Sequence, residues 1–101
     1  MDRELLKDLL LTPGVSGYEE PVQKKFLAWG KTFADDIKID NTGSVIACVI
    51  EEAPMKVLLM GHADEIGFVV TNVDDEGLVH VLRAGGVRPI LYVGTPMQII
   101  H

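Results

Sequence analysis

The residues best suited to chemistry in this sequence are a histidine and an aspartate one residue apart, His62 and Asp64. In an extended chain, side chains two positions apart point to the same side, so an imidazole can bind a metal ion while a carboxylate orients it or its bound water. An apolar run, Val57–Met60, precedes the pair, and open sheets place working groups just past the carboxyl ends of such strands. His62 is therefore the candidate metal ligand, and Asp64 the candidate carboxylate that orients the imidazole or its bound water. Taken alone, a pair this short more often belongs to a solvated loop than to a metal site.

The other acidic and histidine side chains favour structural roles. Glu65 faces away from its predecessor in an extended chain, which favours a structural salt bridge over a general base. The Glu51 and Glu52 pair stands just before a proline and is typical of a solvated loop. His80 has no carboxylate at ligand spacing and is expected to be a packed or surface histidine. His101 ends the chain, where disorder is the usual state.

Two amphipathic helices are predicted in the first third of the chain. Four leucines recur at helical spacing within residues 2–11 and form one apolar stripe: Leu5, Leu6, Leu9 and Leu10. Ser16 and Glu19 then form a Ser-x-x-Glu capping-box pattern, and the periodic apolar residues that follow predict a second helix over about residues 18–34. Gly30 lowers the stability of its last turn by roughly 1 kcal/mol relative to alanine.

The period then changes from helical to strand-like. Ile37 and Ile39 alternate with polar residues before the turn Asn41-Thr42-Gly43, which predicts a β-hairpin with residues 44–51 as its second arm. The run Val57–Met60 does not alternate and is typical of a strand covered on both faces. We therefore expect an α/β fold, in which helices pack on a layered sheet.

The second half contains shorter strand candidates separated by turn sequences. These candidates are residues 67–73, 78–83, 90–93 and 97–100. Gly85-Gly86 is predicted to be a turn or bulge between strands. The spacing is typical of a small β-barrel or sandwich. The last run stops without a turn or polar tail, which indicates a chain cut within an element.

Composition narrows the class of protein. With 101 residues, one small domain or less is expected. The formal charge of -6, with Lys and Arg scattered, argues against a nucleic-acid partner, and no apolar stretch or leader pattern indicates a membrane span or secretion signal. The single Cys48 lies in an apolar run and is expected to pack as a small hydrophobe. A cytoplasmic location fits these features.

Three longer strings, in their order and spacing, resemble the tetrahedral aminopeptidase family, which groups glutamyl and deblocking aminopeptidases, some labelled endoglucanase. They are Gly14-Val15-Ser16-Gly17-Tyr18-Glu19, Asp40-Asn41-Thr42-Gly43-Ser44-Val45-Ile46-Ala47 and Leu58-Leu59-Met60-Gly61-His62-Ala63-Asp64-Glu65-Ile66-Gly67-Phe68. The resemblance covers essentially all 101 residues. Ser44 departs from the family, which usually has Asn there.

The resemblance implies a fold and a site. Residues 1–70 would be the N-terminal segment of a mixed α/β/α metallopeptidase domain, and residues 71–101 the start of an inserted small β-barrel, a PDZ-like dimerisation domain. Two divalent metal ions, zinc or cobalt, would share a water that attacks the first peptide bond of a peptide substrate. His62 matches the family's first metal ligand, and Asp64 the carboxylate that tunes the basicity of the imidazole. A homo-oligomer is also implied.

The family's remaining metal ligands and its general base lie beyond the inserted domain. One imidazole and one supporting carboxylate cannot hold two metals, so we expect these 101 residues alone to be catalytically inactive. Two alternatives remain open: a non-catalytic module that oligomerises through its apolar strands, and another hydrolase of the same di-metal superfamily, carboxypeptidase-like or a deacylase. A glycosidase is disfavoured, because no two carboxylates flank a sugar site.

Overall fold

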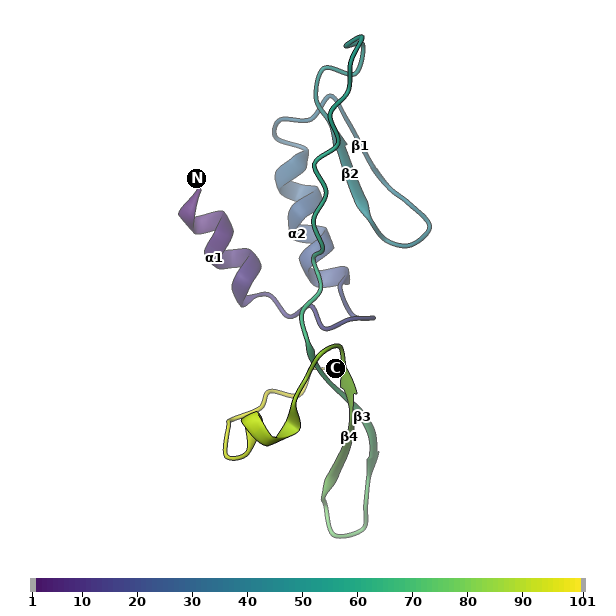
Figure 1. Cartoon of the computed structure of the whole chain (residues 1–101). Helices are drawn as coiled ribbons and strands as arrows, with labels where there is room; N and C mark the ends of the chain where they lie inside the picture. The colour runs from purple at the N-terminus through teal and green to yellow at the C-terminus, as the bar shows by residue number, and fades with distance from the viewer. Residues whose placement is uncertain (1, 101) are drawn as a thin grey trace.

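Helices and hairpins are joined by long connections in the computed structural model, which describes residues 2–100 (Figure 1). The elements are α1 (Arg3–Leu11), α2 (Glu20–Gly30), β1 (Asp36–Ile39), β2 (Val45–Cys48), β3 (Gly67–Val73), β4 (Val79–Ala84) and the 3₁₀-helix η1 (Pro89–Tyr92). Within the described residues, β1 pairs with β2 and β3 with β4, both antiparallel, as two separate two-stranded sheets. The α/β class is confirmed, but the expected single layered sheet does not form within residues 2–100.

The first helix forms where the leucine stripe predicts it. Asp2 caps its N-terminus, since its Oδ1 accepts hydrogen bonds from the backbone N–H groups of Glu4 and Leu5 at 3.0 and 3.1 Å. Leu5, Leu6 and Leu9 of the stripe face α2 and line an apolar cleft of about 350 Å³ with Phe26 and Trp29, whereas Leu10 is 72% exposed and lies outside this cleft. An ion pair between Asp8 and Lys25 also joins the two helices.

The second helix is shorter than predicted, and the capping box does not form. Glu19 is the N-cap residue, but its side chain makes no cap hydrogen bond and accepts instead from the backbone N–H of Gly17 at 2.7 Å. Pro21, in the first turn, is favourable there because the first helical N–H groups lack partners in any case. The helix ends at Gly30, where an added Cβ would lie 2.4 Å from Ile37 Cδ1. Glycine thus lets the first hairpin approach the helix closely.

The first hairpin is held by one aspartate in its turn. Asp40 Oδ1 accepts from the backbone N–H of Thr42 at 2.8 Å, from the Thr42 hydroxyl at 2.6 Å and from the backbone N–H of Ser44 at 2.9 Å. Gly43 adopts a φ of 89°, which favours glycine. The Asp40 side chain therefore sets the register in which Ile39 pairs with Val45. The second arm is shorter than expected, ending at Cys48 rather than residue 51.

The predicted strand Val57–Met60 is not a strand in the structure. It lies in the long connection that runs between the two hairpins (Figure 1). Leu59 is 92% exposed and Met60 is 89% exposed. A strand needs a neighbour to satisfy its backbone groups, and no segment of residues 2–100 pairs with this one.

The second hairpin confirms two strand predictions, while the segments after it differ. β3 and β4 pair with a register shift between Val70 and Asn72, and Gly85, with a φ of 77°, begins the predicted turn. Residues 90–93 were expected to be a strand, but η1 forms because Pro89 favours a helical start. Residues 97–100 have no regular structure. Tyr92 of η1 packs edge-on against Phe68 of β3, with ring centroids 5.8 Å apart.

The described fold leaves much apolar surface exposed. The accessible surface is 8659 Å², whereas a folded monomer of 11.1 kDa exposes about 5,700 Å². The radius of gyration is 17.5 Å, against about 13 Å for a compact domain of this length. Among the described hydrophobic residues, Val22 and Val87 alone are buried, and neither is fully enclosed. Within residues 2–100, neither α-helix has the length and apolar composition needed to cross a membrane.

Candidate functional site

His62 and Asp64 meet as their spacing predicts. The Nδ1 atom of His62 lies 2.9 Å from Asp64 Oδ1 and 3.0 Å from the backbone oxygen of Asp64. The imidazole side chain is 85% exposed and the carboxylate side chain 37% exposed. The pair sits in the connection just before β3, so the imidazole is presented to the outside while the carboxylate is partly covered.

The hydrogen bonds of the imidazole determine its tautomer. Both atoms near Nδ1 are oxygens that can only accept when Asp64 is ionised, so Nδ1 is the donor and carries the proton. In the neutral ring, Nε2 then holds the free lone pair. This is the form in which a histidine binds a metal ion while a carboxylate orients it from behind.

Asp64 is held by a second donor from a distant part of the chain. The Ser16 hydroxyl donates to Asp64 Oδ2 at 2.5 Å, across 48 residues of sequence. This hydrogen bond and, after it, the one from His62 hold the pKa of the Asp64 carboxyl below its ordinary value of 3.8. The carboxylate therefore stays charged and accepts from both sides. Ser16 was predicted to cap α2, and its contact with Asp64 has no signal in the local sequence.

Backbone hydrogen bonds join the loop that carries Ser16 to the segment that carries Asp64. Val15 and Glu65 form a parallel β-bridge, in which Ser16 N–H donates to the Glu65 oxygen at 3.3 Å and Glu65 N–H donates to the Gly14 oxygen at 2.8 Å. We call residues 14–16 with residues 64–65 the strap. An added Cβ at Gly67 would lie 2.6 Å from Val15 Cγ2, so glycine is needed beside the strap.

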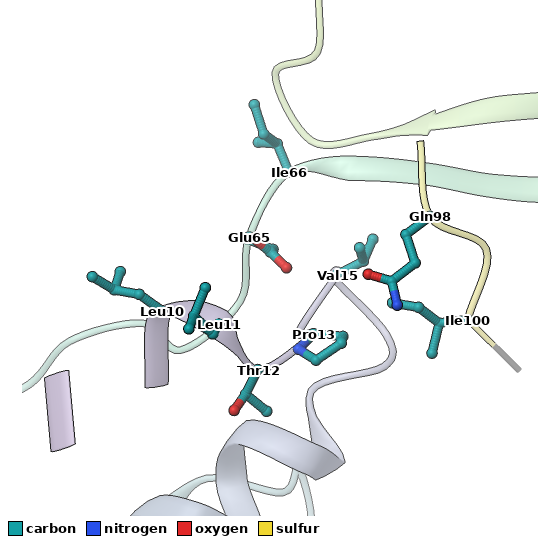
Figure 2. Close-up of a pocket in the computed structure, with 9 residues that line it drawn as sticks. All are labelled: Leu10, Leu11, Thr12, Pro13, Val15, Glu65, Ile66, Gln98 and Ile100. Carbon is teal, nitrogen blue, oxygen red and sulfur yellow. The ribbon is translucent and has the colours of Figure 1, made fainter. Parts of the chain in front are cut away.

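Glu65 belongs to the strap and not to the His–Asp pair. Its Oε1 accepts from the backbone N–H of Gly14 at 3.2 Å, so the predicted salt bridge is wrong and a hydrogen bond to the backbone takes its place. Glu65 also lines a cavity of about 240 Å³, which Figure 2 shows, together with Leu10, Leu11, Thr12, Pro13, Val15, Ile66, Gln98 and Ile100.

The second hairpin holds another histidine–aspartate pair. His80 Nε2 lies 2.9 Å from Asp74 Oδ2. The sequence pattern did not predict this contact, because it is the turn between β3 and β4 that brings these residues, six positions apart, together. Asp74 Oδ1 also accepts from the Leu78 and Glu76 backbone N–H groups. His80 is a surface histidine, as predicted, and its partner stabilises the turn. His101 lies outside the described residues.

The residues present fit part of a metal site. Within residues 2–100, no three His, Cys, Asp or Glu side chains gather closely enough to hold a metal ion. The free Nε2 of His62 and the oriented carboxylate behind it are one ligand and its support. The further protein ligands of a complete metal site would have to come from outside the described residues.

Comparison with known proteins identifies the family to which the chain belongs. The fold is that of a small α/β segment of an aminopeptidase: a TET aminopeptidase from the marine sediment archaeon Thaumarchaeota archaeon SCGC AB-539-E09 matches with a TM-score of 0.77 and 32% identity, over 82% of this chain and 23% of that chain. Residues 43–101 match the family described as M42 glutamyl aminopeptidase. The chain belongs to this family, whose members are metallopeptidases, and divalent metal ions are thereby implied.

Two further relatives support the assignment. A lysyl aminopeptidase from Pyrococcus furiosus is 41% identical over 90 residues, which are 88% of this chain and 26% of the relative. A crystal structure titled endoglucanase, from Thermotoga maritima, matches with a TM-score of 0.77 and 36% identity, over 84% of this chain and 28% of that one. The chain spans about a quarter of the length of the curated relatives it matches.

Proposed function

We propose that the chain supplies His62 as one metal ligand, and Asp64 as the active-site carboxylate behind it, to a di-metal aminopeptidase that removes N-terminal residues from peptides. The observation that carries the proposal is the contact of His62 Nδ1 with Asp64 Oδ1 at 2.9 Å, which leaves Nε2 free. Zinc or cobalt ions would polarise the scissile carbonyl and supply the attacking water. The residues of this chain bind and orient: His62 presents a lone pair, and Asp64 keeps the proton on Nδ1.

The wider organisation belongs to the same proposal. Residues 1–70 would form the N-terminal segment of the catalytic α/β domain, and residues 71–101 the start of the inserted PDZ-like β-barrel through which copies of the enzyme associate. The proposed boundary falls within β3, whose pairing with β4 forms a sheet separate from that of β1 and β2 within the described residues. The one free cysteine, Cys48, is compatible with a cytoplasmic location.

The 101 residues alone are proposed to be inactive. The support is chemical: a metal-bridged water needs two metal ions, whereas the described residues offer one imidazole and its supporting carboxylate. The purified chain should therefore release no amino acid from peptides with added zinc or cobalt. Turnover that follows the chain through purification would contradict this part of the proposal.

A chimera tests the aminopeptidase role directly. This chain would replace the matching segment of the Pyrococcus furiosus lysyl aminopeptidase, which is 41% identical. We expect the chimera to hydrolyse peptides with free N-termini and to lose more than about 100-fold in kcat/KM on His62→Ala, because an oriented metal ligand is removed. His80→Ala is the matched control, since His80 also pairs with an aspartate at 2.9 Å, and it should retain activity. Full activity of the His62→Ala chimera would overturn the assignment.

Zinc binding to the chain itself gives a readout that does not depend on activity. In a zinc titration followed by NMR of the histidine side chains, the His62 signals should shift first and the His80 signals later. His62→Ala should remove the first event. A first event at His80, with His62 unaffected, would contradict the proposed ligand.

A further inference from the structure

We propose that Ser16 is a positioning residue for the metal ligand: its hydroxyl fixes the Asp64 carboxylate so that the proton of His62 stays on Nδ1. This inference rests on the proposed role of His62 and adds to it a residue from the other end of the fold. The observation that carries it is the hydrogen bond from Ser16 Oγ to Asp64 Oδ2 at 2.5 Å.

The two oxygens of Asp64 have separate donors. Oδ2 accepts from the Ser16 hydroxyl at 2.5 Å, and Oδ1 accepts from His62 Nδ1 at 2.9 Å. A carboxylate with a single donor can rotate and exchange its oxygens, whereas two donors on opposite oxygens fix its plane. The orientation of the imidazole then depends on Ser16 as well as on Asp64.

The Ser16 hydroxyl has no competing structural duty in the described fold. Its predicted role as a helix cap is not used, because α2 begins at Glu20 with Glu19 as its N-cap residue. Among the side-chain hydrogen bonds of the described residues, the Ser16 hydroxyl takes part only in that with Asp64. A serine placed at capping-box spacing thus serves a partner 48 residues away.

The strap keeps the Ser16 hydroxyl at this distance from Asp64. Ser16 N–H is bonded to the Glu65 oxygen, and Glu65 N–H is bonded to the Gly14 oxygen, so the backbones on both sides are aligned. The Glu65 carboxylate adds a third link, to the Gly14 N–H at 3.2 Å. The backbone therefore holds Ser16 in place, and removal of its hydroxyl should leave the strap closed.

The test is the tautomer of His62, measured by ¹⁵N NMR at pH 8, where ordinary histidines are neutral. The wild-type chain should show the proton on Nδ1. Ser16→Ala should shift the ring toward a mixture of tautomers and weaken zinc binding by about threefold to tenfold, less than the loss of a direct partner of the histidine. Ser16→Thr keeps a hydroxyl and should restore both values to within about twofold of wild type.

Matched controls separate positioning from folding. Ser44→Ala removes the only other serine of the sequence, which lies in the turn of the first hairpin, and should change neither value. The amide signals of Val15 and Glu65 report whether the strap stays closed. If Ser16→Ala opens it, the His62 tautomer of Ser16→Cys, measured without zinc because a thiol itself binds zinc, decides: a thiol fills the space but donates weakly, so the tautomer should again become mixed.

The outcomes distinguish this inference from the proposed function. If His62→Ala removes the first zinc-binding event while Ser16→Ala matches wild type in tautomer and affinity, or Ser16→Cys matches wild type in the zinc-free tautomer, the role of Ser16 is overturned and His62 stands as the ligand. If His62→Ala leaves zinc binding unchanged, the proposed function fails at its first step. A tautomer shift in Ser16→Ala that Ser16→Thr reverses supports the inference.

Discussion

The two histidine–aspartate pairs of this protein differ in the hydrogen bonds that their aspartates make. His80 contacts Asp74 through Nε2, within a hairpin whose turn the aspartate also caps. His62 contacts Asp64 through Nδ1, and the aspartate is held from behind by a serine. The residue spacing predicted the contact between His62 and Asp64, because side chains two positions apart in an extended chain point to the same side. It could not predict Ser16, because the local capping pattern offered that residue a different role.

Replacing the carboxylate by an amide tests the pair at this scale. Asp64→Asn removes the charge that keeps the proton on His62 Nδ1, and we expect zinc binding to weaken by about tenfold to 100-fold. The measurement is the zinc titration of the histidine signals by NMR. Asp74→Asn, which makes the same change beside His80, is the control and should leave zinc binding at His62 unaltered. Equal effects of both substitutions would mean that net charge, not the contact, is responsible.

Among the helices, strands and turns, those that depend on residue spacing over a few positions could be predicted from the sequence. Both helices, the first hairpin, the two strand candidates that pair as β3 and β4, and the two glycine turns form, because spacing and turn residues act over a few positions. The strand predictions for residues 57–60 and 90–93 were wrong, for different reasons. The first has the composition of a buried strand but no partner within residues 2–100, and the second follows Pro89, whose fixed backbone angle outweighs the strand preference of the apolar residues after it.

The close contact between Gly67 of β3 and Val15 of the strap predicts that a larger side chain at position 67 destabilises the strap and that a smaller one at position 15 compensates. Gly67→Ala would place a Cβ 2.6 Å from Cγ2 and 3.1 Å from Cγ1 of Val15, a stiff β-branched side chain. We expect overpacking to destabilise the strap by about 1–3 kcal/mol, seen as faster hydrogen exchange at the Glu65 amide.

The double variant Gly67→Ala with Val15→Ala separates the clash from other effects. It removes both Cγ atoms and leaves a Cβ contact of 3.5 Å, which is ordinary van der Waals distance. Exchange at Glu65 should return toward the value of Val15→Ala alone. If it does not, the conformational freedom of glycine, and not the contact with Val15, accounts for the effect.

The turn of the first hairpin is predicted to depend on pH. The Thr42 hydroxyl, followed by the Ser44 backbone N–H, holds the pKa of the Asp40 carboxyl below its ordinary value of 3.8. Because the folded pKa is depressed, the stabilisation is fully present above 3.8 and is lost as pH falls through the lower, folded pKa.

The Thr42 and Ser44 amide signals measure this change. They should titrate with a midpoint below 3.8, and the cross-strand contact between Ile39 and Val45 should weaken over the same range. Asp40→Asn keeps an acceptor without a titrating charge, so its signals should stay flat. A midpoint at or above 3.8 would show that the turn does not favour the carboxylate.

For the whole molecule, the exposed apolar surface makes self-association the expected state of the isolated chain. The high apolar fraction of the sequence anticipated this, although it could not show where the surface lies. Val57–Met60 combines exposed apolar side chains with an unpaired backbone, which is the combination that promotes strand pairing between molecules. Sedimentation velocity at micromolar concentration should therefore show species larger than a monomer.

A charge placed in that segment should reduce the association. Leu59→Lys, at the side chain that is 92% exposed, should lower the average mass measured by sedimentation. Leu78→Lys makes the same change at the tip of the second hairpin and is the control. Monomeric behaviour of the wild-type chain would contradict the prediction, and an equal effect of both variants would place the contact elsewhere.

The strap also orders events during synthesis. Ser16 and Asp64 are separated by 48 residues, so their contact cannot form until the ribosome has released the segment ahead of β3. By then both helices and the first hairpin, whose contacts are local, have had time to fold, because the closing of long loops is slower than local structure formation. His62 can therefore contact Asp64 as soon as both residues have left the ribosome, whereas the second donor to that carboxylate is added only when the chain folds back onto the loop that carries Ser16.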